Sequence, residues 1–133
     1  MSIEKGTGEV SVFRTGIQRR FNAYHALRGD FGEESHPHTH SYRVEWVIAT
    51  RDLDDNGFAT DISQMEHELD RLIAELEGTF LNDLSFFHER QTSIENMAAY
   101  LHSLLSELVD GDRIEWMQVT IWESETAFAA YRA

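Results

Sequence analysis

The chain has 133 residues, 41% of them hydrophobic, with one proline, eight glycines and no cysteine, and this length and composition predict one compact domain over residues 1–133. Its 24 acidic and 11 basic residues give a formal net charge of −13, which would repel phosphate backbones and anionic bilayers, so we expect no nucleic-acid and no membrane partner. Residues 1–8 carry no apolar core and no apolar run approaches the length of a membrane span. We therefore expect neither a signal peptide nor a transmembrane helix, and a cytoplasmic protein.

Apolar spacing predicts two strands in the first half of the chain. Residues 10–26 favour a strand that ends near His25, and residues 41–50 alternate as a second strand after a loop rich in glycine, glutamate and histidine. The Asp-Asp-Asn-Gly sequence at 54–57 is a strong turn signal. We expect residues 58–60 to return antiparallel and complete a hairpin.

Two helices are predicted in the second half of the chain. Residues 61–77 carry apolar side chains at every third or fourth position, and Gly78 follows as a helix stop. The second helix is expected to begin at Thr92, whose hydroxyl would form a capping box with Glu95, and to run to about Leu108.

The remaining segments define the predicted fold class. Residues 79–91 are too apolar for a free loop and should pack on the sheet or on another subunit, while 113–122 and 127–131 favour two last strands. Glu123 follows the apolar row of the first of these, so its carboxylate either reaches solvent or is held in a pocket to meet a ligand. The pattern predicts an α+β domain with both helices on one face of an antiparallel sheet, and the apolar surface left over predicts a homo-oligomer.

Histidines provide the candidate metal site. His38 and His40 are two residues apart at the head of the second strand, so both imidazoles leave the same face, and His25 could supply a third nitrogen. Three imidazoles with an open fourth position are typical of a catalytic or ligand-binding zinc site. Ordinary surface histidines in a polar loop are the alternative, and spacing does not decide between them. Four arginines near the histidines could receive an anionic substrate or pair with neighbouring glutamates: Arg19, Arg20, Arg28 and Arg43.

Six segments, in order along nearly the whole chain, resemble the family of 6-pyruvoyl-tetrahydropterin synthase and 6-carboxy-tetrahydropterin synthase. They are Phe-Asn-Ala-Tyr-His at 21–25, His-Thr-His-Ser-Tyr at 38–42, Gly-Phe-Ala-Thr-Asp at 57–61, Leu-Asn-Asp at 81–83, Ser-Ile-Glu-Asn at 93–96, and Glu123.

The resemblance implies a fold, a metal and a ligand. The fold is the tunnelling fold, a four-stranded antiparallel sheet with two helices that assembles through trimeric barrels into hexamers, with active sites between subunits. The metal is zinc, bound by His25, His38 and His40. The resemblance also implies that Glu123 grips the amino-pyrimidinone edge of a pterin, and it makes Ser93 a second candidate for substrate binding.

The chain departs from the family at its proton-transfer residues. The synthases carry a cysteine general base four residues before the His-x-His pair, and Glu34 occupies that place. With a glutamate at this position, the chain resembles a branch of the family that cleaves the side chain of dihydroneopterin triphosphate. The alternative is that Glu34 is only a solvated charge of the loop. Glu77 and Gly78 replace the family's Asp-His relay, and glycine cannot relay a proton. Glu77, His36 and His88 are the candidates to compensate.

We therefore expect a zinc-dependent lyase that acts on the side chain of dihydroneopterin triphosphate or a related reduced pterin. In this interpretation Glu34 shuttles protons and Glu123 orients the ring. The alternatives are a catalytically inactive zinc- and pterin-binding homologue, an enzyme for a different purine-derived heterocycle, and a domain that uses zinc for structure alone.

Overall fold

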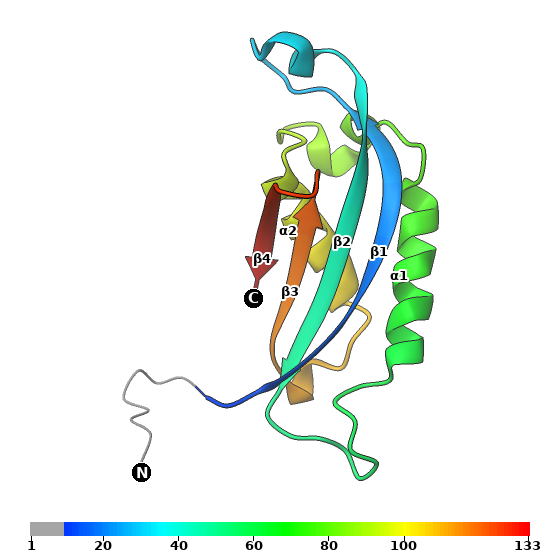
Figure 1. The fold of residues 1–133 in the computed structure, drawn as a ribbon, viewed down its shortest axis with the longest axis vertical. Coiled ribbons are helices and arrows are strands. Elements are labelled where there is room, and N and C mark those ends of the chain that lie inside the picture. The colour runs from blue at the N-terminus through cyan, green and yellow to red at the C-terminus, as the bar shows by residue number, and fades with distance from the viewer. Residues whose placement is uncertain (1–9) are drawn as a thin grey trace.

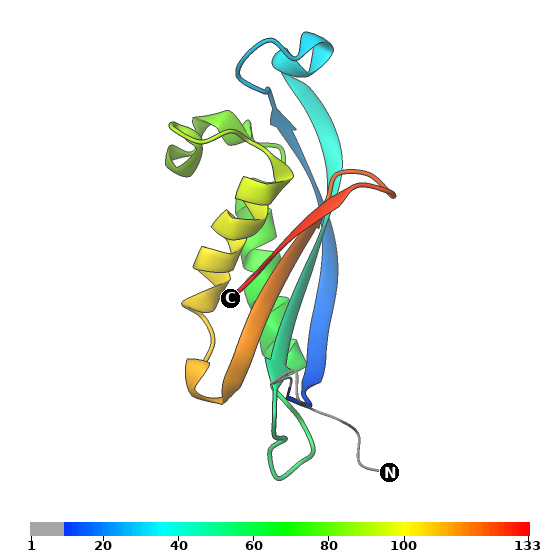
Figure 2. The ribbon, with the colours of Figure 1, turned by 90° about the vertical axis from the view of Figure 1, so that its left-hand side faces the viewer.

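Residues 10–133, the part of the chain that the computed structural model describes, form a four-stranded antiparallel sheet with two helices (Figure 1). Figure 2 shows both helices on the same side of the sheet, so the other face is open. The predicted α+β class is thereby confirmed, while residues 1–8, considered above for a signal peptide, lie outside the described part. The main elements are β1 (Phe13–His25), β2 (His38–Thr50), α1 (Ile62–Leu76), α2 (Ile94–Ser106), β3 (Ile114–Trp122) and β4 (Phe128–Arg132). Short 3-10 turns lie at Gly32–Ser35, Leu81–Asp83, Ser85–Phe87 and Gly111–Arg113.

The register of the sheet brings the predicted site residues to one end. The strand order is β1-β2-β3-β4, and each neighbouring pair is antiparallel. β1 and β2 pair along their whole length, so that His25 at the end of β1 lies opposite His38 at the start of β2. β3 pairs with β2 with Trp122 opposite Arg43. The end of β3 that precedes Glu123 therefore lies beside the histidine end of β2.

The core fills the space between the sheet and the helices. Tyr42, Val44, Trp46 and Ile48 alternate along β2, and each is at most 1% exposed, as expected for residues two apart on one face of a strand. Burying each such side chain contributes roughly 1.5–3 kcal/mol before the entropy cost of ordering the chain. The apolar segment 79–91 packs on this core, as predicted.

α1 agrees closely with its prediction. The side chain of Asp61 accepts a hydrogen bond from the backbone N of Gln64 at 3.3 Å and caps the first turn. Gly78 follows the C-terminal end with φ of +75°, a conformation that costs glycine little. No helix within residues 10–133 is long and apolar enough to cross a membrane.

The start of α2 differs from the prediction. Ser93, not Thr92, is the capping residue, because its hydroxyl accepts the hydrogen bond of Asn96 N at 3.2 Å. Thr92 is completely buried and turns its hydroxyl toward β1 instead. α2 also ends at Ser106, two residues before the predicted end.

The predicted hairpin partner of β2 was wrong. The turn exists, since Gly57 N donates to Asp54 O at 2.9 Å, but residues 58–60 form no strand. Both edges of β2 are already taken, by β1 and by β3, so no edge remains for this segment. Asp54 closes the loop instead, because its Oδ1 accepts hydrogen bonds from the backbone N of Asn56 and Phe58, both at 2.9 Å.

Candidate metal centre and ligand site

Three histidines and one glutamate meet at the end of the β1–β2 pair. The ring centroids lie 4.4 Å apart for His25 and His38, 5.1 Å for His25 and His40, and 4.8 Å for His38 and His40. One ligand atom from each histidine and one carboxylate oxygen of Glu34 all lie within 4.8 Å of one another. The fold thus brings together the three predicted metal ligands and the predicted base, from β1, β2 and the loop between them.

The hydrogen bonds of His25 fix its protonation and its direction. Its Nδ1 lies 2.9 Å from the carbonyl O of Thr92 and 3.1 Å from the Thr92 hydroxyl. A carbonyl oxygen can only accept, so Nδ1 carries the proton and Nε2 carries a lone pair. Burial lowers the pKa of His25, although the hydrogen bond to Thr92 raises it, and the neutral ring is the form that binds metals.

His38 faces other acceptors in the same way. Its Nδ1 donates to the carbonyl O of His36 at 2.8 Å, which leaves the lone pair of the neutral ring on Nε2. That Nε2 lies 2.8 Å from Glu34 Oε2 and 3.1 Å from Nε2 of His40. A proton on His38 would satisfy one of these contacts. A metal ion would satisfy all of them, because it accepts several lone pairs at once.

The donor set therefore fits a metal ion. Nε2 of His25 is buried and has no hydrogen-bond partner among the described residues, which is unusual for a buried polar atom. In a tetrahedral zinc site with Zn–N bonds of about 2.0–2.1 Å, two ligand nitrogens lie roughly 3.3 Å apart. The 3.1 Å between Nε2 of His38 and Nε2 of His40 is close to that separation.

Two polar residues, the half-buried Asn82 and the buried Thr92, hold the first histidine in place. Asn82 accepts from Ala26 N at 3.0 Å and donates to Ala26 O at 2.8 Å, which clamps the residue after His25. The Thr92 hydroxyl donates to Ala26 O at 3.3 Å, so it can accept the proton of His25 Nδ1. Sequence analysis noticed Asn82 only as part of a motif and interpreted Thr92 as a helix cap.

Tyr42 is a further residue of the site that sequence analysis missed. Its ring lies 5.4 Å from that of His40, and its hydroxyl is buried without a hydrogen-bond partner in the described chain. Burial raises the pKa of Tyr42, and the charges of Glu123 and Glu34 raise it further. Glu34 and Glu123 are therefore both within electrostatic reach of one buried hydroxyl.

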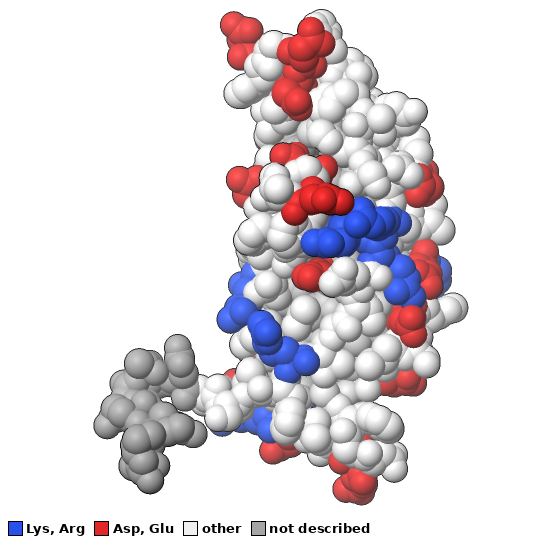
Figure 3. All heavy atoms as spheres, viewed as in Figure 1, with Lys and Arg blue, Asp and Glu red and all other residues white. Residues whose placement is uncertain are grey.

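Glu123 borders a hollow on the open face of the sheet. It lies in the turn after β3, where its backbone N donates to Ala127 O at 3.1 Å. The hollow has a volume of about 330 Å³ and is lined also by Arg20, Arg43 and Trp122. Figure 3 looks onto this face and shows basic and acidic side chains side by side over the sheet. The guanidinium of Arg43 lies 4.6 Å above the Trp122 ring, and its Nε is buried without a hydrogen-bond partner in residues 10–133.

The other two arginines of the predicted basic group are engaged elsewhere. Arg19 pairs with Glu66 at 2.8 Å and Asp70 at 2.7 Å. The side chain of Arg28 donates to the carbonyl O of Arg90 at 2.8 Å. Of the four arginines, Arg20 and Arg43 thus remain the candidates to meet an anionic group beside Glu123.

The side chains of the candidates for a proton relay do not belong to the metal group of His25, Glu34, His38 and His40. Both carboxylate oxygens of Glu77 accept a hydrogen bond from the backbone N of Asn22, each at 3.2 Å. His88 Nε2 donates to Asp83 O at 3.1 Å, and His36 contributes its carbonyl to His38. The Ser93 hydroxyl caps α2, so a role in substrate binding stays a prediction.

Comparison with solved structures establishes the fold. The 6-pyruvoyl tetrahydropterin synthase of Caenorhabditis elegans matches with a TM-score of 0.81 and 20% identity, over 92% of this chain and 96% of that chain. The Plasmodium falciparum enzyme matches with a TM-score of 0.78 and 17% identity, over 93% and 99%. A Plasmodium vivax 6-pyruvoyltetrahydropterin synthase, in which a glutamate described as a catalytic residue is replaced by cysteine, gives 0.76 and 18%, over 93% and 99%. These likenesses confirm the expected tunnelling fold.

Sequence comparison extends the likeness from fold to family. The family model for 6-pyruvoyl tetrahydropterin synthase matches residues 15–133, while a comparison with curated proteins found no match. Because the matched segment includes all three histidines, both candidate carboxylates and every strand but the first two residues of β1, the chain belongs to the 6-pyruvoyl tetrahydropterin synthase family.

Proposed function

We propose that this protein is a zinc-dependent lyase that acts on the side chain of dihydroneopterin triphosphate or a related reduced pterin. Membership of the 6-pyruvoyl tetrahydropterin synthase family supports the pterin class. The observation that carries the proposal is the carboxylate of Glu34 at 2.8 Å from His38, inside the group of three convergent histidines. A base beside a candidate metal centre is the arrangement that deprotonation of a substrate hydroxyl requires.

His25, His38 and His40 would hold the zinc ion. When bound, zinc supplies Lewis-acid chemistry, which lowers the pKa of a coordinated hydroxyl and stabilises the oxyanion. Each of the three residues would contribute one ring nitrogen of the group, and Thr92 keeps the ring of His25 in the tautomer that donates its Nε2 lone pair.

Glu34 would act as the general base. Its side chain is 53% exposed, so its carboxylate can take a proton at the site and release it to water. The backbone of the loop holds it in position, because Leu27 N donates to Glu34 O at 2.8 Å. The Plasmodium vivax relative, in which a glutamate is described as a catalytic residue, supports this role by analogy.

Glu123 would orient the heterocycle. A carboxylate can accept two hydrogen bonds from the amino group and ring N–H of a pterin. Arg20 and Arg43 line the same hollow and offer positive charge to phosphates of the side chain. Glu123 and Glu34 both raise the pKa of Tyr42, whose ring lies beside His40. The resemblance to the family implies active sites between subunits, so we infer that complete sites form in a trimer or hexamer.

A catalytically inactive homologue that binds zinc and a pterin is the second candidate function. Gly78 stands where the family carries its relay histidine, and Glu77 is engaged with the backbone of Asn22. An enzyme for a different purine-derived heterocycle would retain the same zinc and ring-binding residues.

The test is to incubate the zinc-loaded protein with dihydroneopterin triphosphate and to resolve the pterin products by chromatography. Glu34→Ala is compared with Glu33→Ala, a matched control at an exposed neighbour outside the metal group. We expect a side-chain-cleaved pterin from the unaltered protein and from Glu33→Ala, and none from Glu34→Ala, with zinc content and pterin affinity nearly equal in all three.

The other outcomes separate the alternatives. Unchanged substrate together with measurable pterin affinity in calorimetry would favour the inactive binding homologue. If neither turnover nor pterin affinity is observed, the proposal moves to a different heterocycle. Equal turnover in Glu34→Ala and Glu33→Ala would refute the role of Glu34 as the base.

A further inference from the structure

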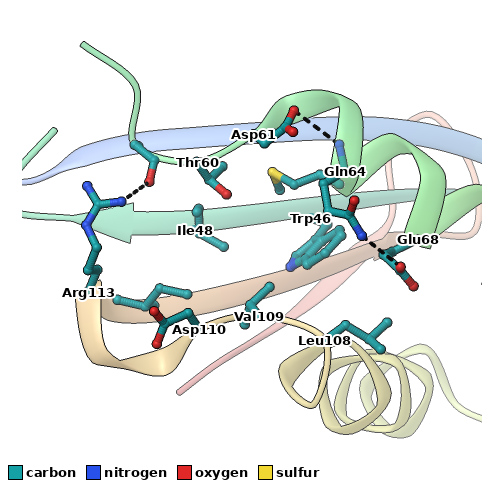
Figure 4. A pocket seen from close by; sticks show the side chains of 13 residues that line it. Trp46, Ile48, Thr60, Asp61, Gln64, Glu68, Leu108, Val109, Asp110 and Arg113 are labelled. Atoms are coloured by element: carbon teal, nitrogen blue, oxygen red, sulfur yellow. Dashed lines mark hydrogen bonds between the residues drawn. The ribbon is translucent and has the colours of Figure 1, made fainter. Parts of the chain in front are cut away.

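A second pocket lies on the helix face of the sheet, far from the histidines. It opens between α1, the connection from α2 to β3, and β2, and has a volume of about 200 Å³ (Figure 4). Trp46, at its floor, is six residues beyond His40 on β2, a distance of roughly 20 Å at 3.3 Å per residue. The pocket is therefore separate from the candidate metal centre and from the hollow beside Glu123.

The floor of the pocket is apolar and deeply buried. Trp46 and Ile48 are 1% exposed, and Met65 is 2% exposed. Leu108 and Asp110 are exposed and form part of the rim, so the pocket opens to solvent on one side. A cavity of roughly 150 Å³ is enough to hold a benzene ring. The space here therefore accommodates one six-membered ring with a small substituent.

One buried hydrogen-bond donor at this floor has no partner. Trp46 Nε1 is buried and has no hydrogen-bond acceptor within the part of the chain that the structure describes. Figure 4 shows this indole nitrogen directed into the pocket, between Ile48 and Val109. An unsatisfied buried N–H costs about 1–3 kcal/mol, and a ligand oxygen in the pocket would remove that cost.

Polar groups of the wall restrict the charge of the ligand. Asp61, Glu68 and Asp110 line the pocket against a single cation, Arg113. That arginine already donates to Ala59 O at 3.1 Å, as Figure 4 shows, and to the carbonyl of Asp52 at 3.3 Å. Three carboxylates and an engaged guanidinium disfavour an anion.

The carboxylate of Glu68 is engaged by neighbours on α1. Its Oε1 accepts from Gln64 Nε2 at 2.9 Å, and its Oε2 forms an ion pair with Arg71 at 3.9 Å. The pocket thus presents one free hydrogen-bond donor, Trp46 Nε1, at an apolar floor, the pattern of a small-molecule site that orients its ligand by a few polar groups.

We propose that this pocket is a binding site for a small uncharged aromatic or heteroaromatic molecule. Its ring packs on Ile48 and Met65, and its carbonyl or hydroxyl oxygen accepts the hydrogen bond of Trp46 Nε1. The site goes beyond the proposed pterin chemistry and does not depend on it.

The experiment uses benzamide, an uncharged ring with one carbonyl and one amide NH2 group, as the probe. The chain has three tryptophans, so a ¹H–¹⁵N spectrum contains three indole N–H signals, and Trp46→Phe assigns the one of interest. We expect benzamide to shift the Trp46 signal saturably and to leave those of Trp116 and Trp122 in place. Benzoate, of nearly the same size but anionic, should bind at least tenfold more weakly.

Two variants make the test specific to the pocket. Val109→Phe fills the pocket and should weaken benzamide binding at least tenfold, whereas Val10→Phe, the same change at an exposed position outside it, should not. If Val109→Phe fails to fold by circular dichroism, Trp46→Phe followed by calorimetry carries the same test. No saturable shift of the Trp46 signal, equal binding of benzoate, or full binding by the folded filled variant would each overturn the proposal.

Discussion

Thr92→Val tests whether the Thr92 hydroxyl holds the ring of His25 in the orientation that binds metal. Valine has nearly the shape of threonine, so the change removes the hydroxyl without opening a cavity. Two contacts are lost, the one of 3.1 Å to His25 Nδ1 and the one of 3.3 Å to Ala26 O. The backbone carbonyl of Thr92, at 2.9 Å from Nδ1, remains. The ring of His25 thus keeps its tautomer but loses one of its two restraints.

The magnitude follows from these contacts. Removing partners of a metal-binding histidine typically lowers metal affinity about 10–100-fold. Because the shorter bond to the carbonyl is kept, we expect the lower end of that range, about tenfold, or about 1.4 kcal/mol. The free energy of unfolding of the metal-free protein should fall by about 1 kcal/mol, since both lost hydrogen bonds are long.

The assay is competition for zinc against a chromophoric chelator, together with urea unfolding of the metal-free protein. Thr50→Val is the matched control, because Thr50 is 1% exposed and its hydroxyl has no hydrogen-bond partner among residues 10–133. This control should leave zinc affinity unchanged and leave stability unchanged or slightly raised. Equal zinc affinity in Thr92→Val and Thr50→Val would refute the restraint of His25 by the Thr92 hydroxyl.

Two further predictions concern parts of the chain outside the site. Gly78→Ala should lower the free energy of unfolding by about 1 kcal/mol, because the φ of +75° at Gly78 disfavours a Cβ even though no atom lies within 4 Å of where it would be. Gly111→Ala, where an added Cβ also meets no atom, should leave the free energy of unfolding unchanged. Equal urea midpoints for the two variants would contradict this reasoning. Hydrogen bonds from the backbone of Phe58, and then of Asn56, lower the pKa of Asp54. A lowered folded pKa means that the stabilisation of this loop is present above the unfolded value of about 3.9 and is lost as pH falls through the folded pKa. The amide signals of Phe58 and Asn56 should therefore titrate together below that value, and a flat response in NMR would contradict the role of Asp54.

The sequence predicted those elements whose signals are local. α1 has a strong apolar periodicity, a capping aspartate and a glycine stop, and its observed bounds differ from the predicted ones by one residue at each end. The partner of β2 is not a local property. Residues 58–60 follow a turn that was predicted correctly, but β3 occupies the edge of β2 that they were expected to pair with. β3 begins more than fifty residues later and has a longer apolar row.

The site shows the same division between local pattern and tertiary context. Spacing along β2 placed His38 and His40 on one face, and the end of the first strand offered His25 as a third nitrogen. The resemblance added Glu34, and the fold brings all four together. The role of Thr92 could not be read from sequence. Two adjacent hydroxyls, on Thr92 and Ser93, can each cap a helix, and only the packing of α2 against β1 decides which one turns to His25.

In the proposed reaction, the exposure of Glu34 would make up for the glycine at position 78, where the family resemblance implies a relay histidine. A buried base needs a chain of groups to return its proton to solvent, and a histidine next to an acid is a common form of such a chain. The carboxylate of Glu34 is 53% exposed and touches His38 directly. In the proposed reaction it would take the proton at the site and exchange it with water from its own position. On this proposal Gly78 would not interrupt proton transfer, because Glu34 itself would exchange the proton with water.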